Sequence, residues 1–302
     1  MQVTRLDLDG TGSPTGLVTK ILKVETDLAI PVKIEELAYQ LDISEIGELT
    51  TDGFEGGLIT DDIRSVGGIL VRKGANRHRR RFTIGHELGH FLLPFHKPVK
   101  TGEFLCSREA MRLWTASEQD RYARMEVEAN QFAALMLMPP PQLRAFLAGL
   151  KAPDLANVLA VHEHFDVSRE AAARAYAQYQ GEKIAIVVIK DARILRCYRS
   201  ARFPELSVRN GQSAPRQSGV YIAPGATGAI SPIREIGAEH WLETKWSVRS
   251  PSLYEQVAHQ SAGFAMVLLW AELDEDDDAD PEEGMTSKER YKDRLSRSTG
   301  RY

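Results

Sequence analysis

The segment of this sequence best equipped for chemistry is His-Glu-Leu-Gly-His at residues 86–90. On a helix, with about 3.6 residues per turn, His86 and His90 point to the same side and can bind one divalent metal ion. Glu87 lies roughly 100° further round such a helix, where its carboxylate can reach a water molecule on the metal without being a ligand. Glu87 is therefore a candidate general base that activates water for hydrolysis.

The flanking residues predict a helix that positions this segment. Thr83 can cap the amino end, Phe91 continues the run, and Pro94 stops it. Leu88 and Leu92 fall opposite the metal side, so one face can enter a core while the other meets a cleft. The HExxH pattern alone leaves two alternatives open, a chance occurrence and a buried helix with two structural histidines. A third ligand is needed to decide between them.

A later helix offers this third ligand. Residues Arg121 to Met138 are rich in helix formers and end at the three prolines 139–141. We predict Glu126 as the ligand, because a carboxylate on a helix with an apolar packing surface needs a compensating partner such as a metal. Asn130, one turn later, could orient a ligand. The alternative for Glu126 is a surface charge paired with an arginine of the same helix.

Together the two segments resemble the ImmA/IrrE family of metallopeptidases. The second segment reads Glu-Val-Glu-Ala-Asn-Gln-Phe-Ala-Ala at residues 126–134, followed by Leu-Met-Pro at 137–139. Arg-Phe-Thr at residues 81–83, just before the first segment, also matches the family pattern. The resemblance spans residues 16–180, and two ordered motifs are more specific than either motif alone.

The resemblance implies a fold, an activity and a set of site residues. Relatives are bacterial and phage enzymes that cleave Xre-like helix-turn-helix repressors and so switch on stress-response or mobile-element genes. By this resemblance His86, His90 and Glu126 bind the metal, Zn²⁺ or alternatively Mn²⁺, and Glu87 is the catalytic base. We therefore expect a zinc-dependent metalloendopeptidase that acts on a repressor protein. The alternative is a non-catalytic, metal-stabilised regulator that binds DNA or protein.

A long loop is expected between the two motifs, from Phe95 to Asp120, where it could cover or shape the cleft. We expect Cys106 to be a half-buried thiol. Its alternative role is a thiolate that fills the open metal position of a resting enzyme. His96 is expected at the surface, with a hydrogen bond to a developing oxyanion as the alternative. A closed site with Cys106 bound would favour the non-catalytic function, and an open site would favour the enzyme.

The resemblance implies a mainly helical, zincin-like peptidase core, and the hydrophobic periodicity predicts an α+β protein whose core contains a small sheet. Helical spacing covers residues 16–26 and 32–41, and short strand-like runs follow at 43–49, 57–60 and 68–71. Such a sheet could form one wall of the cleft above the metal.

These patterns predict that the chain is divided into four parts. They are a metallopeptidase core at 1–150, a helix-turn-helix-like segment at 151–180, a β-rich domain at 181–271 and a charged tail at 272–302. By analogy with relatives, the β-rich domain is expected to have a sensory or regulatory role. The low hydrophobicity of the tail predicts disorder.

The segment from Leu155 to Tyr179 predicts two helices around a turn at Asp166, with Ser168 as a cap. Acidic residues match or exceed basic ones between positions 151 and 180, whereas phosphate binding needs the opposite balance. Packing or partner docking is therefore favoured over DNA binding. The basic run from Arg77 to Arg81 predicts a solvated loop with one or two structural arginines, and guidance of an acidic substrate or nucleic acid is its alternative.

Beyond residue 180 the runs at 183–190 and 262–270 predict strands. Trp241, Trp246 and Trp270 can contribute to the core of that domain.

Composition sets further limits on the class of protein. The 302 residues carry a formal net charge of −4 with a pI of about 6.1, which disfavours a general nucleic-acid binder. The amino terminus does not read as a signal peptide, and no apolar run approaches the roughly 20 residues that span a bilayer. Only two cysteines occur, so a disulfide framework is not expected. These features predict a cytoplasmic protein without a membrane segment.

Overall fold

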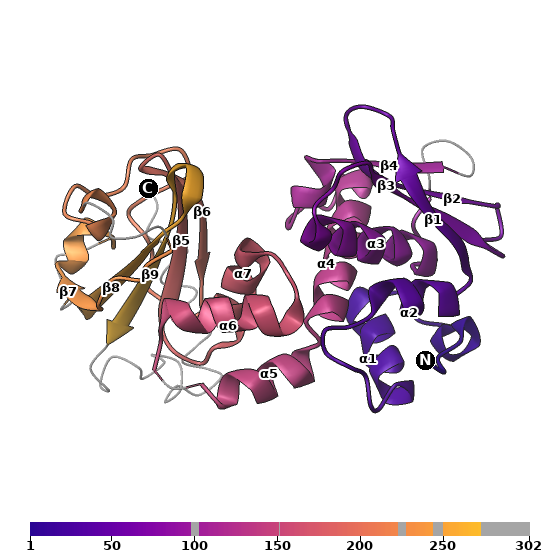
Figure 1. Ribbon diagram of the computed structural model, residues 1–302, viewed down its shortest axis with the longest axis horizontal. Coiled ribbons are helices and arrows are strands. Elements are labelled where there is room, and N and C mark those ends of the chain that lie inside the picture. Colours follow the sequence, from indigo (N-terminus) through magenta and orange to yellow (C-terminus); the bar gives the residue numbers. More distant parts are fainter. Residues whose placement is uncertain (98–102, 151, 223–227, 244–249, 273–302) are drawn as a thin grey trace, which may run out of the picture. The chain divides into compact units, whose positions relative to one another are not determined.

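The computed structural model describes residues 1–97, 103–150, 152–222, 228–243 and 250–272. The chain divides into two compact units, Met1–Gln180 and a second unit that begins at Gly181 (Figure 1). Helices and a small sheet make up the first unit, and a larger sheet dominates the second, so the structure is mixed α+β. The tail predicted to be disordered lies, from residue 273 onward, outside the described residues. Within the described ranges, no helix combines the length and apolarity required to cross a bilayer.

The elements of the first unit follow the sequence pattern closely. Its α-helices are α1 (Pro14–Val24), α2 (Ile34–Gln40), α3 (Arg77–Leu92), α4 (Arg121–Leu137), α5 (Pro140–Ala148), α6 (Leu155–Phe165) and α7 (Arg169–Tyr179). Its strands are β1 (Ile43–Leu49), β2 (Phe54–Thr60), β3 (Gly67–Arg72) and β4 (Glu103–Ser107). The three strand-like runs before residue 72 are confirmed as β1, β2 and β3. Helix α5 was not expected, and it begins with a proline at a position where a missing N–H costs nothing.

The sheet has the order β1-β3-β2-β4, with β1 parallel to β3 and the other pairs antiparallel. Side chains of β3 alternate between buried and half-buried, and those of Ile69 and Val71 enter the core. Strands β2 and β3 contact α3, which lies between the sheet and the helices α1, α2 and α4 in Figure 1. The sheet therefore forms a wall along one side of the helix that carries the histidines.

Helix α3 begins earlier than expected. Asn76 is its amino cap and accepts a hydrogen bond from the backbone N–H of Arg79 at 2.9 Å, whereas Thr83 lies inside the helix and is fully buried. The prediction of Thr83 as the cap was therefore wrong, and the basic run is the first part of the helix rather than a loop. Every residue from Thr83 to Phe91 is buried, because the sheet covers one side of α3 and helices cover the other. No face of this stretch is left exposed.

The segment between Phe95 and Asp120 is not simply a loop. It contains β4, which adds a strand to the edge of the sheet beside β2. Phe104 and Cys106 of β4 face inward and are buried, while Glu103 and Leu105 are exposed. The alternation of buried and exposed side chains extends over only five residues and is flanked by charged and polar residues. For this reason the sequence pattern did not indicate a strand here.

The helix-turn-helix-like segment is present as α6 and α7. Ser168 caps α7 as expected, accepting a hydrogen bond from the N–H of Ala171 at 3.1 Å. Asp166 adopts a left-handed conformation in the turn, with φ of 52°. Its carboxylate pairs with Arg77 at 2.8 Å, with Arg81 at 3.1 Å and with His78 at 3.3 Å. The basic run is thus largely bound to this turn within the unit.

The second unit is an antiparallel sheet of order β6-β5-β9-β8-β7. Its strands are β5 (Ile184–Lys190), β6 (Arg193–Arg199), β7 (Arg234–Ile236), β8 (Ser252–His259) and β9 (Phe264–Glu272). Trp241 is fully buried in the core and donates a hydrogen bond from Nε1 to Glu255 at 3.1 Å. Trp270 is only half-buried, and Trp246 lies outside the described residues. The two predicted strands are confirmed as β5 and β9.

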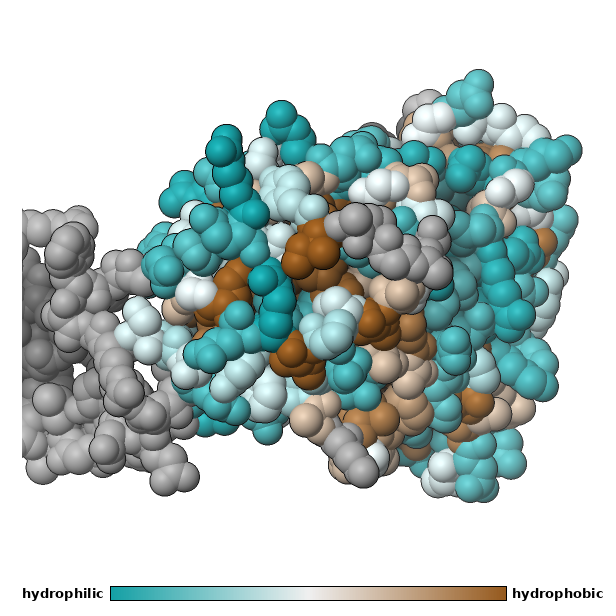
Figure 2. All heavy atoms as spheres, turned by 60° about the vertical axis from the view of Figure 1, so that its left-hand side comes forward, coloured by the Kyte–Doolittle hydropathy of each residue, from teal (hydrophilic) through white to brown (hydrophobic). Residues whose placement is uncertain are grey.

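On the face shown in Figure 2, hydrophobic residues form several small groups separated by hydrophilic side chains. Scattered apolar exposure of this kind is normal for a protein surface and does not by itself mark a docking site.

Candidate metal centre

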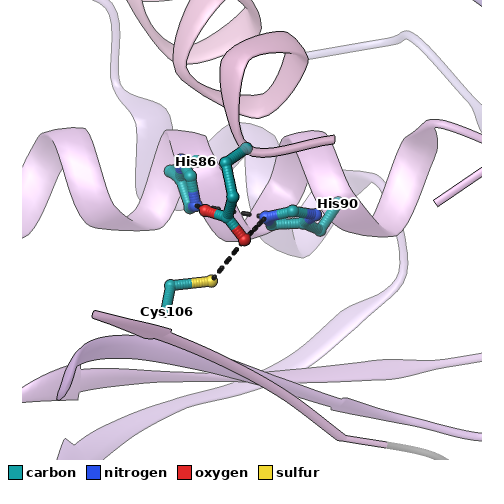
Figure 3. A group of neighbouring side chains, drawn as sticks. His86, His90 and Cys106 are labelled. Carbon is teal, nitrogen blue, oxygen red and sulfur yellow. Dashed lines mark hydrogen bonds and ion pairs between the residues drawn. The ribbon is translucent and has the colours of Figure 1, made fainter. Parts of the chain in front are cut away.

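Four side chains from three elements converge in the first unit. His86 and His90 come from α3, Glu126 from α4 and Cys106 from β4, and one ligand atom from each lies within 4.8 Å of the others. Figure 3 shows the two histidines facing the thiol of Cys106 across this group. All four side chains are at most 1% exposed. The structure thus brings together the three predicted ligands and adds a cysteine that was expected to be only half-buried.

Small residues allow α3 and α4 to approach closely enough for this convergence. A Cβ atom on Gly85 would lie 3.2 Å from Cβ of Ala133, and one on Gly89 would lie 3.3 Å from Cα of Ala129. Gly85 and Gly89 are one turn apart, as are Ala129 and Ala133, so two matching rows of small residues meet. The short distance between the helices brings the carboxylate of Glu126 to the histidines.

Asn130 fixes the orientation of His86. Nδ1 of His86 lies 2.9 Å from Oδ1 of Asn130, and the Asn130 amide nitrogen donates to the carbonyl oxygens of Ala110 at 3.1 Å and Leu113 at 2.8 Å. Those two carbonyls identify the amide nitrogen, so Oδ1 must accept from His86. His86 therefore carries its hydrogen on Nδ1 and presents the lone pair of Nε2 to the site. This is the role predicted for Asn130.

His90 is held by a second chain of hydrogen bonds. Its Nδ1 lies 2.9 Å from Nδ1 of His96, and Nε2 of His96 lies 2.9 Å from the carboxylate of Glu128. Because Glu128 accepts, His96 carries its hydrogen on Nε2 and its Nδ1 can accept from His90. Nε2 of His90 is then also free to bind a metal. His96 is 1% exposed, so the expectation of a surface histidine was wrong.

The distances between the donor atoms fit one metal ion. Nε2 of His86 is 3.1 Å from Nε2 of His90 and 3.3 Å from Glu126 Oε2, and Nε2 of His90 is 3.7 Å from Glu126 Oε1. In a tetrahedral site with bonds of about 2.0–2.1 Å, neighbouring ligand atoms are about 3.4 Å apart. Two imidazole lone pairs at such a distance repel each other unless a proton or a cation lies between them. The donor set of two imidazoles and one carboxylate suits zinc.

Charge in this buried group is distributed unevenly. Burial alone would raise the pKa of Glu126, but the adjacent imidazoles of His86 and His90 lower it far below its usual range. Burial would likewise lower the pKa of His86, and the neighbouring carboxylates raise it instead. Burial lowers the pKa of His90 to about 4. Glu126 is therefore an anion and His90 a neutral base at neutral pH, as metal ligands must be.

Glu87 lies beside the ligands without being one of the converging donors. It is fully buried, its Oε1 has no hydrogen-bond partner, and Oε2 accepts from the thiol of Cys106 at 3.6 Å. Oε2 of Glu126 also lacks a hydrogen-bond donor, although Nε2 of His86 lies 3.3 Å away. That contact is no hydrogen bond because the hydrogen of His86 is on the other nitrogen. Unpartnered buried carboxylate oxygens are costly, and a cation would compensate for them.

The space occupied by Glu87 depends on a glycine of β2. A Cβ atom on Gly56 would lie 2.4 Å from Cγ2 of Thr83 and 2.6 Å from Oε1 of Glu87. Burial raises the pKa of Glu87 to about 8, so the carboxyl is protonated at neutral pH without a metal. A nearby divalent cation favours the carboxylate form. Glu87 can then accept a proton.

Cys106 is the part of the site that sequence reasoning placed least well. Its Sγ lies 4.0 Å from Oε1 of Glu126, and burial together with two neighbouring carboxylates raises the pKa of the thiol well above its usual range. The two functional contacts that sequence reasoning missed, His96 with His90 and Glu128 with His96, have no local signal. They depend on how the chain after α3 folds back towards α4.

Comparison with known proteins gives a family match for the segment that contains the site. The chain is 14% identical to a Mycobacterium tuberculosis transcriptional regulator of known structure, with a TM-score of 0.47 over 88% of this chain and 74% of that one. No curated protein matches the sequence. Residues 56–176 match the peptidase M78 family, described as the IrrE N-terminal-like domain, and include both motifs. This match over residues 56–176 confirms the resemblance inferred from the two motifs.

Proposed function

We propose that this chain is a metal-dependent endopeptidase of the cytoplasm, with zinc as its ion and manganese as the alternative. His86, His90 and Glu126 would hold the metal, and Glu87 would be the general base. One observation carries the proposal. Nε2 of His86, Nε2 of His90 and the unpartnered oxygens of Glu87 and Glu126 converge in one buried place. The match of residues 56–176 to a peptidase family supports the same conclusion.

The side chains have separate tasks in this mechanism. When bound, the metal supplies a Lewis acid that polarises the peptide carbonyl and lowers the pKa of water towards about 7. Asn130 and His96 hold the two imidazoles in the orientation that binding requires. Glu87 accepts the proton of the attacking water on Oε1, which has no other partner. Glu87 then gives that proton to the leaving amine.

The substrate we propose is a protein, an Xre-like helix-turn-helix transcriptional repressor, whose cleavage would derepress stress-response or mobile-element genes. The family resemblance supports this choice. Strand β4 also supports a peptide substrate, because among the described strands it pairs only with β2. Its other edge leaves backbone groups that an extended peptide could pair with. Direct DNA binding is not favoured, since the arginines of the basic run already pair with Asp166, Glu55 and Glu35.

The test is a cleavage assay with a metal analysis. The protein and its Glu87→Gln variant are incubated with the Xre-like regulator encoded nearest its gene, and fragments are identified by mass spectrometry. We expect cleavage by the wild type only, with equal metal content in both proteins. Cleavage by Glu87→Gln at the wild-type rate would refute the role of Glu87. Metal analysis of the same samples separates zinc from manganese.

A second candidate function is a non-catalytic, metal-stabilised regulator. The position of Cys106 favours it, because four protein ligands are typical of a structural zinc site, whereas a catalytic site keeps one position open. If the protein contains metal but cuts none of the Xre-like regulators tested, this second function is the better one.

A further inference from the structure

The metal centre contains one more donor than the proposed reaction can use. Three protein ligands and one water complete a catalytic zinc site, but four protein donors lie within 4.8 Å of one another here. Sγ of Cys106 and a water molecule would compete for the same position. We propose, on the basis of the proposed function, that the Cys106 thiolate is the fourth ligand of a resting form and must leave the metal before a peptide can be cut.

The pairing of β4 with β2 orients the side chain of Cys106 towards the site. Cys106 pairs with Gly56 across the β2–β4 ladder, and the alternation of β4 turns its side chain inward together with that of Phe104. Gly56 has no side chain on this side of the sheet, so nothing from β2 separates the thiol from the helix beneath it. The position of the sulfur is therefore set by a hydrogen-bonded strand and not by a free loop.

The distances agree with coordination. For a tetrahedral zinc site with a Zn–S bond of about 2.3 Å, a sulfur and a neighbouring oxygen ligand are about 3.5 Å apart. Sγ of Cys106 is 4.0 Å from Oε1 of Glu126, and only a small side-chain adjustment separates the two values. Thiolate is also a better ligand for zinc than the water it would replace.

Burial points to a closed form as well. His86, Glu87 and His90 are 0% exposed, and Glu126 and Cys106 are 1% exposed. A peptide carbonyl must reach the metal and Glu87 for hydrolysis to occur. With Cys106 in the group, the site is filled by the protein itself. Withdrawal of Cys106 would open the metal position and also free the space beside Oε2 of Glu87, which lies 3.6 Å from Sγ.

The test uses cobalt in place of zinc, because a cobalt–thiolate bond gives a charge-transfer band in the near ultraviolet. The full chain is loaded with Co²⁺ as the wild type, as Cys106→Ser, as Cys106→Ala and as Cys197→Ser. Cys197 is the other free cysteine and lies in the second unit, which makes it the matched control. We expect the band in the wild type and in Cys197→Ser, and its loss in both Cys106 variants. A wild-type spectrum without the band overturns the proposal.

A second measurement tests whether the metal coordination position occupied by Cys106 becomes free when the thiol is removed. Acetohydroxamate binds a metal only where a coordination position is free, and its affinity is reduced by the fraction of closed protein. We expect it to bind the cobalt-loaded Cys106→Ala variant at least about tenfold more tightly than the wild type. Equal affinity overturns the proposal. Cys106→Ser retains the size of the side chain and serves if the alanine variant does not fold.

The outcomes separate this proposal from the proposed function. If the wild type lacks the band but cuts the regulator, the peptidase stands and the closing role of Cys106 fails. If the band is present and neither the wild type nor Cys106→Ala cuts any Xre-like regulator, Cys106 is a ligand of a structural site. Faster cleavage by Cys106→Ala than by the wild type, together with the band, supports both.

Discussion

Replacement of His96 tests whether the hydrogen-bond chain behind His90 positions a metal ligand. In His96→Leu the Nδ1–H of His90 loses its acceptor in a place with no solvent, which costs about 1–3 kcal/mol. Loss of a residue that orients a metal ligand weakens metal binding by about 10- to 100-fold, which corresponds to about 1.4–2.7 kcal/mol. The two ranges agree, so most of the cost should appear as a weaker affinity for zinc.

His96→Asn is the matched control. The side-chain oxygen of asparagine can take the place of Nδ1 and accept from His90, although the contact with Glu128 is lost. We expect His96→Asn to bind zinc within a few-fold of the wild type, and His96→Leu to bind it far more weakly. Zinc affinity is measured by competition with a chromophoric chelator, and urea unfolding of the metal-free proteins measures their stability. If His96→Leu binds zinc within about twofold of the wild type, His96 does not position His90.

Three further predictions concern the same unit. Gly56→Ala should lower the free energy of unfolding by about 1–3 kcal/mol, because its Cβ would lie 2.4 Å from Cγ2 of Thr83; an unchanged urea midpoint contradicts this. The raised pKa of Glu87 means that the folded metal-free protein holds a proton that the unfolded chain loses. The contribution of Glu87 to stability should therefore fall by about 1.4 kcal/mol per pH unit from its unfolded pKa to about 8. Glu87→Gln should lack this slope, and parallel urea curves for the two proteins would refute the assignment. Asp166→Asn should cost about 1–3 kcal/mol by removing the partner of Arg81, as thermal unfolding can measure; unaltered stability would mean that this ion pair contributes nothing.

The three candidate ligands could be predicted from the sequence because each prediction depends on the periodicity of a single helix. His86 and His90 share a face of α3 whatever surrounds it, and the prolines after Met138 define the end of α4. Their common role as metal ligands stays a prediction until metal is measured. The same local logic located β1, β2 and β3 of the first sheet and Ser168 as the cap of α7.

Features that depend on distant contacts were not predicted. Asn76 rather than Thr83 begins α3, because the basic run that read as a loop is stabilised by carboxylates far away in the sequence, such as Asp166. His96 is buried only because the chain after α3 returns to Glu128. Cys106 enters the site only because residues 103–107 pair with β2. These contacts join residues that are at least 32 positions apart in the sequence, and no periodicity within one element encodes them.

The close approach of α3 and α4 has a consequence for the choice of ion. The histidines belong to one helix and Glu126 to the other, so the separation of the two backbones sets the radius of the ion that fits between them. Gly85 and Gly89 allow that short separation because neither has a Cβ atom between the two helices. A methyl group at either position would push the helices apart and make the site larger, which favours a bigger ion such as manganese over zinc. We therefore expect Gly85 and Gly89, which are not among the donor residues, to influence which ion the site prefers.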